Sequence, residues 1–187
     1  MKTIKSMKTF MIALVAGIIA ISCSSDDDNT PEVINEEEVI TTVRVQLAND
    51  VGFTTTLQSV DSDGDGPEAP VITIEGDLFA NTTYTGVVTF LNETESPAEN
   101  ITLEVAEEAD EHQVFYTPAD GLNITTVYND QDSNGNPLGI LFTLTTGEAS
   151  NGNFTVTLRH EPTKPNNGLA DAGGDTDVEV TFDVTIQ

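Results

Sequence analysis

Two short acidic segments of the chain have the spacing of a calcium-binding loop. Oxygen-bearing side chains stand at alternate positions and a glycine follows them: Asp61, Asp63 and Asp65 in the first segment, and Asp130, Asp132 and Asn134 in the second. Ca²⁺ takes several oxygen ligands, and alternate positions of a tight loop bring their oxygens to one point. Glu68 or a carboxylate from a neighbouring loop would complete the first shell. The spacing therefore predicts two candidate calcium sites.

Neither segment is an EF-hand. The bidentate glutamate of that loop is replaced by Ile72 in the first segment and by Leu141 in the second, and no helical pattern flanks either one. Residues 171–177 are a weaker third candidate. Aspartate, asparagine and glycine are also the residues that tight turns use, so turns that bind no cation are the alternative interpretation.

The two histidines of the chain are a candidate transition-metal pair. His112 follows Glu111, and His160 precedes Glu161. Imidazole is a good ligand for zinc and copper, so a fold that brought these residues together would create a site for either metal. The histidines have no short ligand spacing, however, and the alternative is that each lies separately at the surface or at a strand end.

Catalytic motifs are absent from the sequence. The chain contains no G-x-S-x-G, Walker loop, G-x-G-x-x-G or H-E-x-x-H, and its carboxylates are too numerous for one pair to stand out as acid and base. Its one cysteine is used for another purpose, described below. We therefore expect a protein that is not an enzyme.

The elements that must position these residues read as strands. Apolar and polar residues alternate, with threonine, valine and phenylalanine frequent, in residues 39–48, 84–92, 122–128, 139–146, 153–160 and 177–187. Glycine, asparagine and aspartate cluster between these segments, as in hairpin loops. The pattern predicts an all-β fold, a single antiparallel immunoglobulin-like β-sandwich formed by residues 38–187.

One segment, residues 96–112, fits this scheme poorly. Ser96 and Glu99 have capping-box spacing, with Pro97 at the first helical position. The apolar residues fit a helix at intervals of four and a strand at intervals of two: Ile101, Leu103, Val105 and Ala109. The acidic residues that follow favour a surface helix, so we expect at most one short helix, near residues 98–110.

Residues 78–84 resemble the tyrosine corner of fibronectin-type and immunoglobulin-like sandwiches. Leu78, Thr82 and Tyr84 occupy the matching positions. The resemblance implies that the Tyr84 hydroxyl bonds back to the preceding turn. It carries no information about ligands.

The N-terminus reads as a lipoprotein signal. Three lysines precede an apolar run over residues 10–21, which is too short to span a membrane and typical of a signal peptide of residues 1–22. Cys23 follows Ala20-Ile21-Ser22 in a bacterial lipobox pattern and would become the lipid-bearing N-terminus. Residues 23–37 are acidic and contain a proline, which predicts a disordered tether. This short acidic run resembles the export signal that Bacteroidota use for surface lipoproteins of the outer membrane.

The net charge limits the choice of partners. Removal of residues 1–22 leaves 3 basic residues against 32 acidic ones, which gives a formal charge of −29. Such a chain repels nucleic acid and anionic membrane surfaces and attracts cations. The acidity also keeps an exposed protein soluble, which is an equally good explanation for it.

Several segments together resemble a group of small surface lipoproteins of flavobacteria and related bacteria. They are the acidic tether, VDSDGDGPEAPVI, NTTYTG, DEHQVFY, TLRHEP and GGDTDVEVTFDVT. The resemblance implies a protein that works beside TonB-dependent receptors. It also implies a type 1 periplasmic-binding fold, with which the strand pattern disagrees, because that fold needs two lobes with many helices.

Two functions from different classes fit these observations. The first is a non-catalytic, lipid-anchored surface binding module, accessory to uptake across the outer membrane, that captures calcium or another cation through its acidic loops. The second is a structural or adhesive surface lipoprotein without a small-molecule ligand. A stoichiometric transporter partner would favour the first.

Lipidation at Cys23 can be tested by metabolic labelling. Radioactive palmitate should label the wild-type protein and leave the Cys23→Ala variant unlabelled, because the only thiol of the chain is then gone. The variant should also leave the membrane fraction. An unlabelled wild-type protein would contradict the lipobox interpretation.

Overall fold

The computed structural model describes residues 38–64 and 66–187, which belong to one compact unit. The predicted signal peptide, Cys23, the tether 23–37 and Asp65 lie outside the described residues. Within the described part, no helix is long and apolar enough to cross a membrane.

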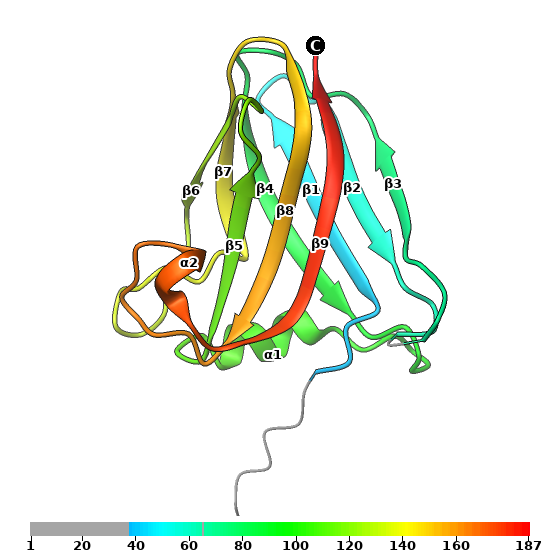
Figure 1. Cartoon of the computed structure of the whole chain (residues 1–187), viewed down its shortest axis with the longest axis vertical. Coiled ribbons are helices and arrows are strands. Elements are labelled where there is room, and N and C mark those ends of the chain that lie inside the picture. Colours follow the sequence, from blue (N-terminus) through cyan, green and yellow to red (C-terminus); the bar gives the residue numbers. More distant parts are fainter. Residues whose placement is uncertain (1–37, 65) are drawn as a thin grey trace, which may run out of the picture. The chain divides into compact units, whose positions relative to one another are not determined.

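The described chain forms two antiparallel sheets that face each other as a β-sandwich (Figure 1). The larger sheet has the order β3-β2-β1-β4-β7-β6, and its strands are β1 (Thr42–Asn49), β2 (Thr54–Val60), β3 (Val71–Glu75), β4 (Thr83–Leu91), β6 (Ile124–Tyr128) and β7 (Leu141–Thr146). The smaller sheet has the order β5-β8-β9, and its strands are β5 (His112–Pro118), β8 (Ser150–His160) and β9 (Asp175–Ile186). The predicted all-β class is confirmed.

The core lies between the sheets and follows the alternation of the sequence. In β9, residues 180, 182, 184 and 186 are buried and the residues between them are exposed. The same alternation buries Val43, Val45 and Leu47 of β1. Successive side chains of a strand point to opposite faces, so one face of each sheet contributes to a shared apolar layer. This layer includes Tyr84, Phe90, Phe142, Phe154 and Phe182.

Three strands were not predicted, and each departs in its own way from a strand with one buried apolar face and one exposed polar face. β2 places Thr55 and Ser59 at buried positions, so its inner face is partly polar. β3 is exposed at every position. β5 is buried at five consecutive positions because a loop covers its outer face, where Asn166 donates a hydrogen bond to Gln113 Oε1 at 2.8 Å.

The helical prediction is partly wrong. Helix α1 (Ile101–Glu107) is present, but its N-cap residue is Asn100, which makes no side-chain cap, so the Ser96–Glu99 capping box does not form. Glu99 instead pairs its backbone with Asn92 in an isolated β-bridge, with both N···O distances 3.0 Å. A second helix, α2 (Leu169–Ala172), is also present, which corrects the expectation of at most one.

The predicted tyrosine corner is confirmed in its geometry. Tyr84 is fully buried, and its hydroxyl accepts a hydrogen bond from the backbone N–H of Phe79 at 2.8 Å. Leu78 is buried beside it, and the Thr82 hydroxyl donates to the Ala80 carbonyl at 3.0 Å. The corner therefore holds the chain where it enters β4.

The contribution of this corner can be measured with Tyr84→Phe. The variant leaves the Phe79 N–H without its partner, so the free energy of unfolding in urea should fall by about 1–3 kcal/mol. Thr83→Val is the matched control. It removes an exposed hydroxyl from the residue directly before Tyr84 and should change the free energy of unfolding by about 0.5 kcal/mol or less. Equal effects of the two substitutions would contradict the structural role of Tyr84.

Candidate metal centre

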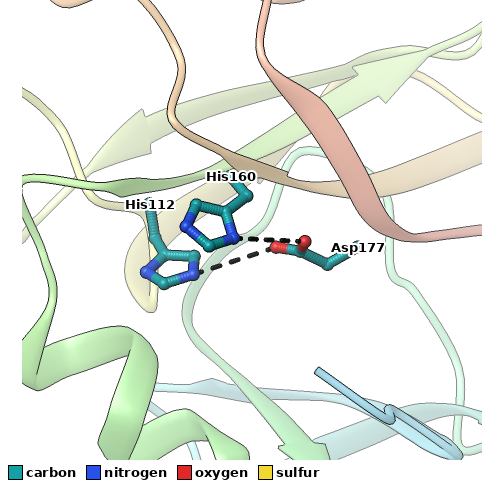
Figure 2. Close-up of side chains that lie close together, drawn as sticks. All are labelled: His112, His160 and Asp177. Atoms are coloured by element: carbon teal, nitrogen blue, oxygen red, sulfur yellow. Dashed lines mark ion pairs between the residues drawn. The ribbon is translucent and has the colours of Figure 1, made fainter. Parts of the chain in front are cut away.

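The smaller sheet brings the two histidines of the chain together. His112 is the first residue of β5 and His160 the last of β8, and the antiparallel register places them directly opposite each other. Their ring centroids are 4.6 Å apart. His112 is fully buried and His160 is 5% exposed. Because both are at inward-facing positions of their strands, the imidazoles lie side by side inside the sandwich, at one end of it (Figure 2).

Asp177 of β9 completes a triad with them (Figure 2). One carboxylate oxygen, Oδ2, lies 3.9 Å from His112 Nε2, and the other, Oδ1, lies 3.8 Å from His160 Nδ1. Strand alternation alone would turn Asp177 outward, because Val178 and Val180 face inward. The β8–β9 register shifts at Leu158/Arg159, so that residue 177 has no partner in β8. Such a bulge redirects a side chain, and here it accounts for the 3% exposure of the Asp177 side chain.

A fourth group comes from the segment that leads into β1. Glu38 Oε1 lies 3.4 Å from His112 Nε2, and the Glu38 side chain is only 7% exposed. Three buried atoms of this cluster have no hydrogen-bond partner among the described residues: Glu38 Oε2, His112 Nε2 and Asp177 Oδ2. Buried polar atoms are nearly always paired, so these three atoms are the unusual feature of the cluster.

Burial and charge crowding raise two pKa values here. Burial raises the pKa of Asp177 to about 6, and the Glu38 carboxylate adds to the rise, although both histidines oppose it. Burial alone would lower the pKa of His112, but the neighbouring Glu38 outweighs it and the pKa of His112 is raised. Without a cation, the cluster therefore holds protons more tightly than its separate residues would in water.

The surroundings orient His112 for a ligand at Nε2. Its Nδ1 lies 3.2 Å from the Glu108 carbonyl oxygen. The tautomer with its proton on Nδ1 donates to that oxygen and leaves the Nε2 lone pair free, as is usual for metal-binding histidines. The buried Lys164 ammonium donates to the carbonyl oxygens of His112 and Ala109, which fixes the backbone at the start of β5.

The distances in the cluster are longer than ordinary hydrogen bonds and are compatible with a shared metal ion. Hydrogen bonds between nitrogen and oxygen span about 2.7–3.2 Å. Tetrahedral zinc, with ligands at about 2.0–2.1 Å, separates neighbouring ligand atoms by roughly 3.4 Å. The three carboxylate–imidazole separations described above are 3.4, 3.8 and 3.9 Å. One ligand atom from each of His112, His160 and Asp177 can be chosen so that all lie within 4.8 Å of one another.

The carboxylates that the sequence placed beside the histidines lie at the edge of this cluster. Glu111 Oε2 is 3.9 Å from His160 Nε2, but its side chain is 59% exposed. With Glu161 it forms a second group around His160, and that group is open to solvent. Sequence reasoning missed Glu38. It included Asp177 only in the weak calcium candidate 171–177, since nothing in the sequence marks the bulge.

The second predicted calcium segment uses its carboxylates to hold a turn. Asp130 accepts hydrogen bonds from the backbone N–H groups of Gly139 and Leu141 at 2.7 and 2.8 Å. Asp132 accepts from those of Asn134 and Asn136 at 2.9 and 2.8 Å. Burial would raise the pKa of Asp132, but these hydrogen bonds and Lys164 lower it. The structure thus explains both aspartates as turn formers, and calcium binding here stays a prediction.

The aspartates of the first predicted calcium segment have different roles in the structure. Asp63 accepts a hydrogen bond from the Glu68 N–H at 3.2 Å, which closes the turn. Asp61 lines a hollow together with Glu38 and Asp177. Its buried Oδ1 has no hydrogen-bond partner among the described residues. Asp61 thus shares this hollow with two residues of the histidine cluster.

Comparisons with known proteins do not assign this arrangement to a family. No protein-family model, curated protein or solved structure matches the chain. The resemblance to flavobacterial surface lipoproteins therefore stays a prediction, and the case for a function rests on the geometry of the cluster.

The raised pKa of Asp177 predicts a pH dependence of stability in metal-free protein. The folded state binds the Asp177 proton more tightly than the unfolded state, where the pKa is near 3.8. Asp177 therefore stabilises the folded state most at a pH below 3.8. The free energy of unfolding falls by about 3 kcal/mol as the pH rises to 6 and above. Urea denaturation of EDTA-treated wild-type and Asp177→Asn protein across this range should show a steeper fall in the wild type, because the raised pKa of His112 contributes to both profiles. Parallel profiles would contradict the assignment.

Proposed function

We propose that the chain is a binding module for one divalent transition metal ion, zinc or copper. His112, His160 and Asp177 would hold the ion. Glu38, whose carboxylate groups with His112 and Glu108 and not with the other two, would become the fourth ligand only by moving toward them. The observation that carries the proposal is the set of buried, unpaired nitrogen and oxygen atoms that converge there. Two imidazoles and two carboxylates suit these metals, and the ion would neutralise the crowded charge.

Binding rather than catalysis is the function that this ligand set supports. Catalytic zinc sites keep one coordination position open for water or substrate, whereas structural sites have four protein ligands. Once Glu38 moved toward Asp177 and the histidines, the four residues would fill a tetrahedral shell. The side chains of all four residues are at least nine-tenths buried, which supports a closed site.

For the cellular setting, we propose a lipid-anchored protein on the outer face of the outer membrane, accessory to a TonB-dependent receptor. The support is the lipobox at Cys23, the acidic segment after it and the family resemblance. We also propose that the sandwich is immunoglobulin-like, on the strength of the tyrosine corner at Tyr84.

Calcium is a second candidate ligand, favoured by one observation. Asp61, Glu38 and Asp177 line a hollow of about 380 Å³, and each has an unpaired buried carboxylate oxygen. A hard cation could occupy this hollow through oxygen ligands alone. The alternative of a structural or adhesive module would apply if no metal binds at either place.

Calorimetric titration of zinc into the EDTA-treated mature protein tests the proposal. We expect one ion per chain, and the His112→Ala and His160→Ala variants should each lose most of the affinity, because a nitrogen ligand is gone. Zinc at a hundredfold excess over its Kd should also raise the free energy of unfolding by about 2.7 kcal/mol.

The control is Glu107→Gln, which removes an exposed carboxylate of α1 and should bind like the wild type. Equal zinc affinity in the histidine variants and the wild type would show that the ion binds elsewhere, and no binding at all would reject the proposal. Calcium titrated into the double histidine variant tests the hollow beside Asp61 separately.

A further inference from the structure

The two layers of the sandwich are unequal, and the smaller one ends early on one side. Sheet β5-β8-β9 covers the larger sheet only as far as β9, and β3 lies beyond it (Figure 1). On the opposite side, the free edge of β5 is closed, because the Val114 N–H donates to the Leu138 carbonyl at 2.7 Å. Among the described residues, the smaller sheet therefore has an open strand position beside β9.

The side chains of β3 show what this open position leaves uncovered. Ile74 is paired with Leu57 and Ile72 with Ser59, so both isoleucines face the space between the sheets. Leu57 and Ser59 are buried, yet Ile72 is 42% and Ile74 is 40% exposed. These isoleucines have the orientation of core residues but lack the second layer that would bury them.

The backbone edge of β9 offers the matching hydrogen bonds. Directly after β9, the Gln187 N–H donates to the Leu78 carbonyl, and the Gln187 carbonyl accepts from the Ala80 N–H. The backbone N–H and C=O of residue 187 therefore face away from β8. Backbone groups alternate in direction along a strand, so Thr181 and Asp183 also direct theirs to the free edge. No described residue pairs with that edge between these positions and the bridge of Leu78 with Ile186.

We propose that β9 accepts an added strand from a partner protein, an extended segment in which apolar residues alternate with lysine or arginine. Its apolar side chains would cover Ile72 and Ile74. Its basic side chains would lie on the outer face, where β9 exposes Glu179 and Asp183. Strand addition of this kind takes affinity from main-chain hydrogen bonds and specificity from alternate side chains.

Charge favours a basic partner segment over two other occupants of the β9 edge, a second copy of the chain and the acidic residues 24–37 of the same chain. A second copy paired edge to edge through β9 would bring two acidic outer faces together, and like charges opposed across strands are destabilising. Residues 24–37 of the same chain are also acidic. A basic, alternating segment is the occupant that complements both the apolar inner side and the anionic outer side. This surface is separate from the proposed metal ligands, except that β9 also carries Asp177.

Binding of a designed peptide tests the proposal. The probe is a fluorescein-labelled octapeptide of alternating lysine and valine, measured by anisotropy in physiological salt against an isomer of the same composition with paired lysines and paired valines. The alternating peptide should bind at least about tenfold more tightly, because only it presents one apolar face and one basic face. Equal binding of the two isomers, or binding of neither, would overturn the proposal.

The edge itself is tested with Thr181→Pro. Proline removes the N–H that faces the free edge but no bond to β8, so the variant should fold and bind the alternating peptide about tenfold more weakly. Thr181→Ala is the matched control, since it loses the same hydroxyl, which pairs with Thr155, but keeps the N–H. Ile74→Ser, which keeps the β9 edge intact, should also weaken binding. Wild-type affinity in Thr181→Pro or in Ile74→Ser would refute strand addition at β9.

Discussion

The β-bulge between β8 and β9 is the constraint on which the candidate site depends. The two histidines face each other as a consequence of the β5–β8 register, but two imidazoles alone do not make a strong site. The bulge at Leu158/Arg159 brings in Asp177 from a position that strand parity would turn to solvent. An ionisable carboxylate is costly to bury, and the raised pKa of Asp177 reflects that cost. The proposed cation would offset this cost and satisfy the unpaired atoms around Asp177.

The site also depends on contacts outside the sheets. Lys164 is buried among acidic and carbonyl groups and ties the loop after β8 to the start of β5, where His112 begins the strand. Burial lowers the pKa of Lys164, although Asp132 opposes this. The turn built by Asp130 and Asp132 therefore supports the cluster from outside, which gives these aspartates a structural role. Glu38 connects the cluster to the segment that follows the predicted tether.

The parts of the fold that could be predicted are those where one face of a strand is apolar and the other polar. Residues 43–47 and 178–186 show this alternation, and the structure buries the expected side chains. β5 could not be found in this way, because the core buries its inner face and a loop covers its outer face. A helix was expected near residues 98–110, but Glu99 forms a β-bridge with Asn92, and α1 begins after it at Ile101. Local propensity yielded there to a tertiary hydrogen-bonding requirement.

The candidate site shows the same division. The two histidines and their neighbouring glutamates indicated a transition-metal pair in the sequence. That His112 and His160, 48 positions apart, lie opposite each other depends on the pairing of β5 with β8, which no local sequence pattern encodes. The aspartates of 130–135 fit a calcium spacing as well as they fit a turn, and their hydrogen bonds in the structure show the turn. The open edge of β9 could not be predicted from the sequence either, because it depends on how many strands each sheet contains.

X-ray absorption spectroscopy of the zinc-loaded protein tests the central claim most directly. The account predicts a four-coordinate site with two imidazole nitrogens and two carboxylate oxygens at about 2.0–2.2 Å, and loss of the imidazole scattering in a His112→Ala, His160→Ala variant. A spectrum with oxygen ligands alone, unchanged in that variant, would contradict it.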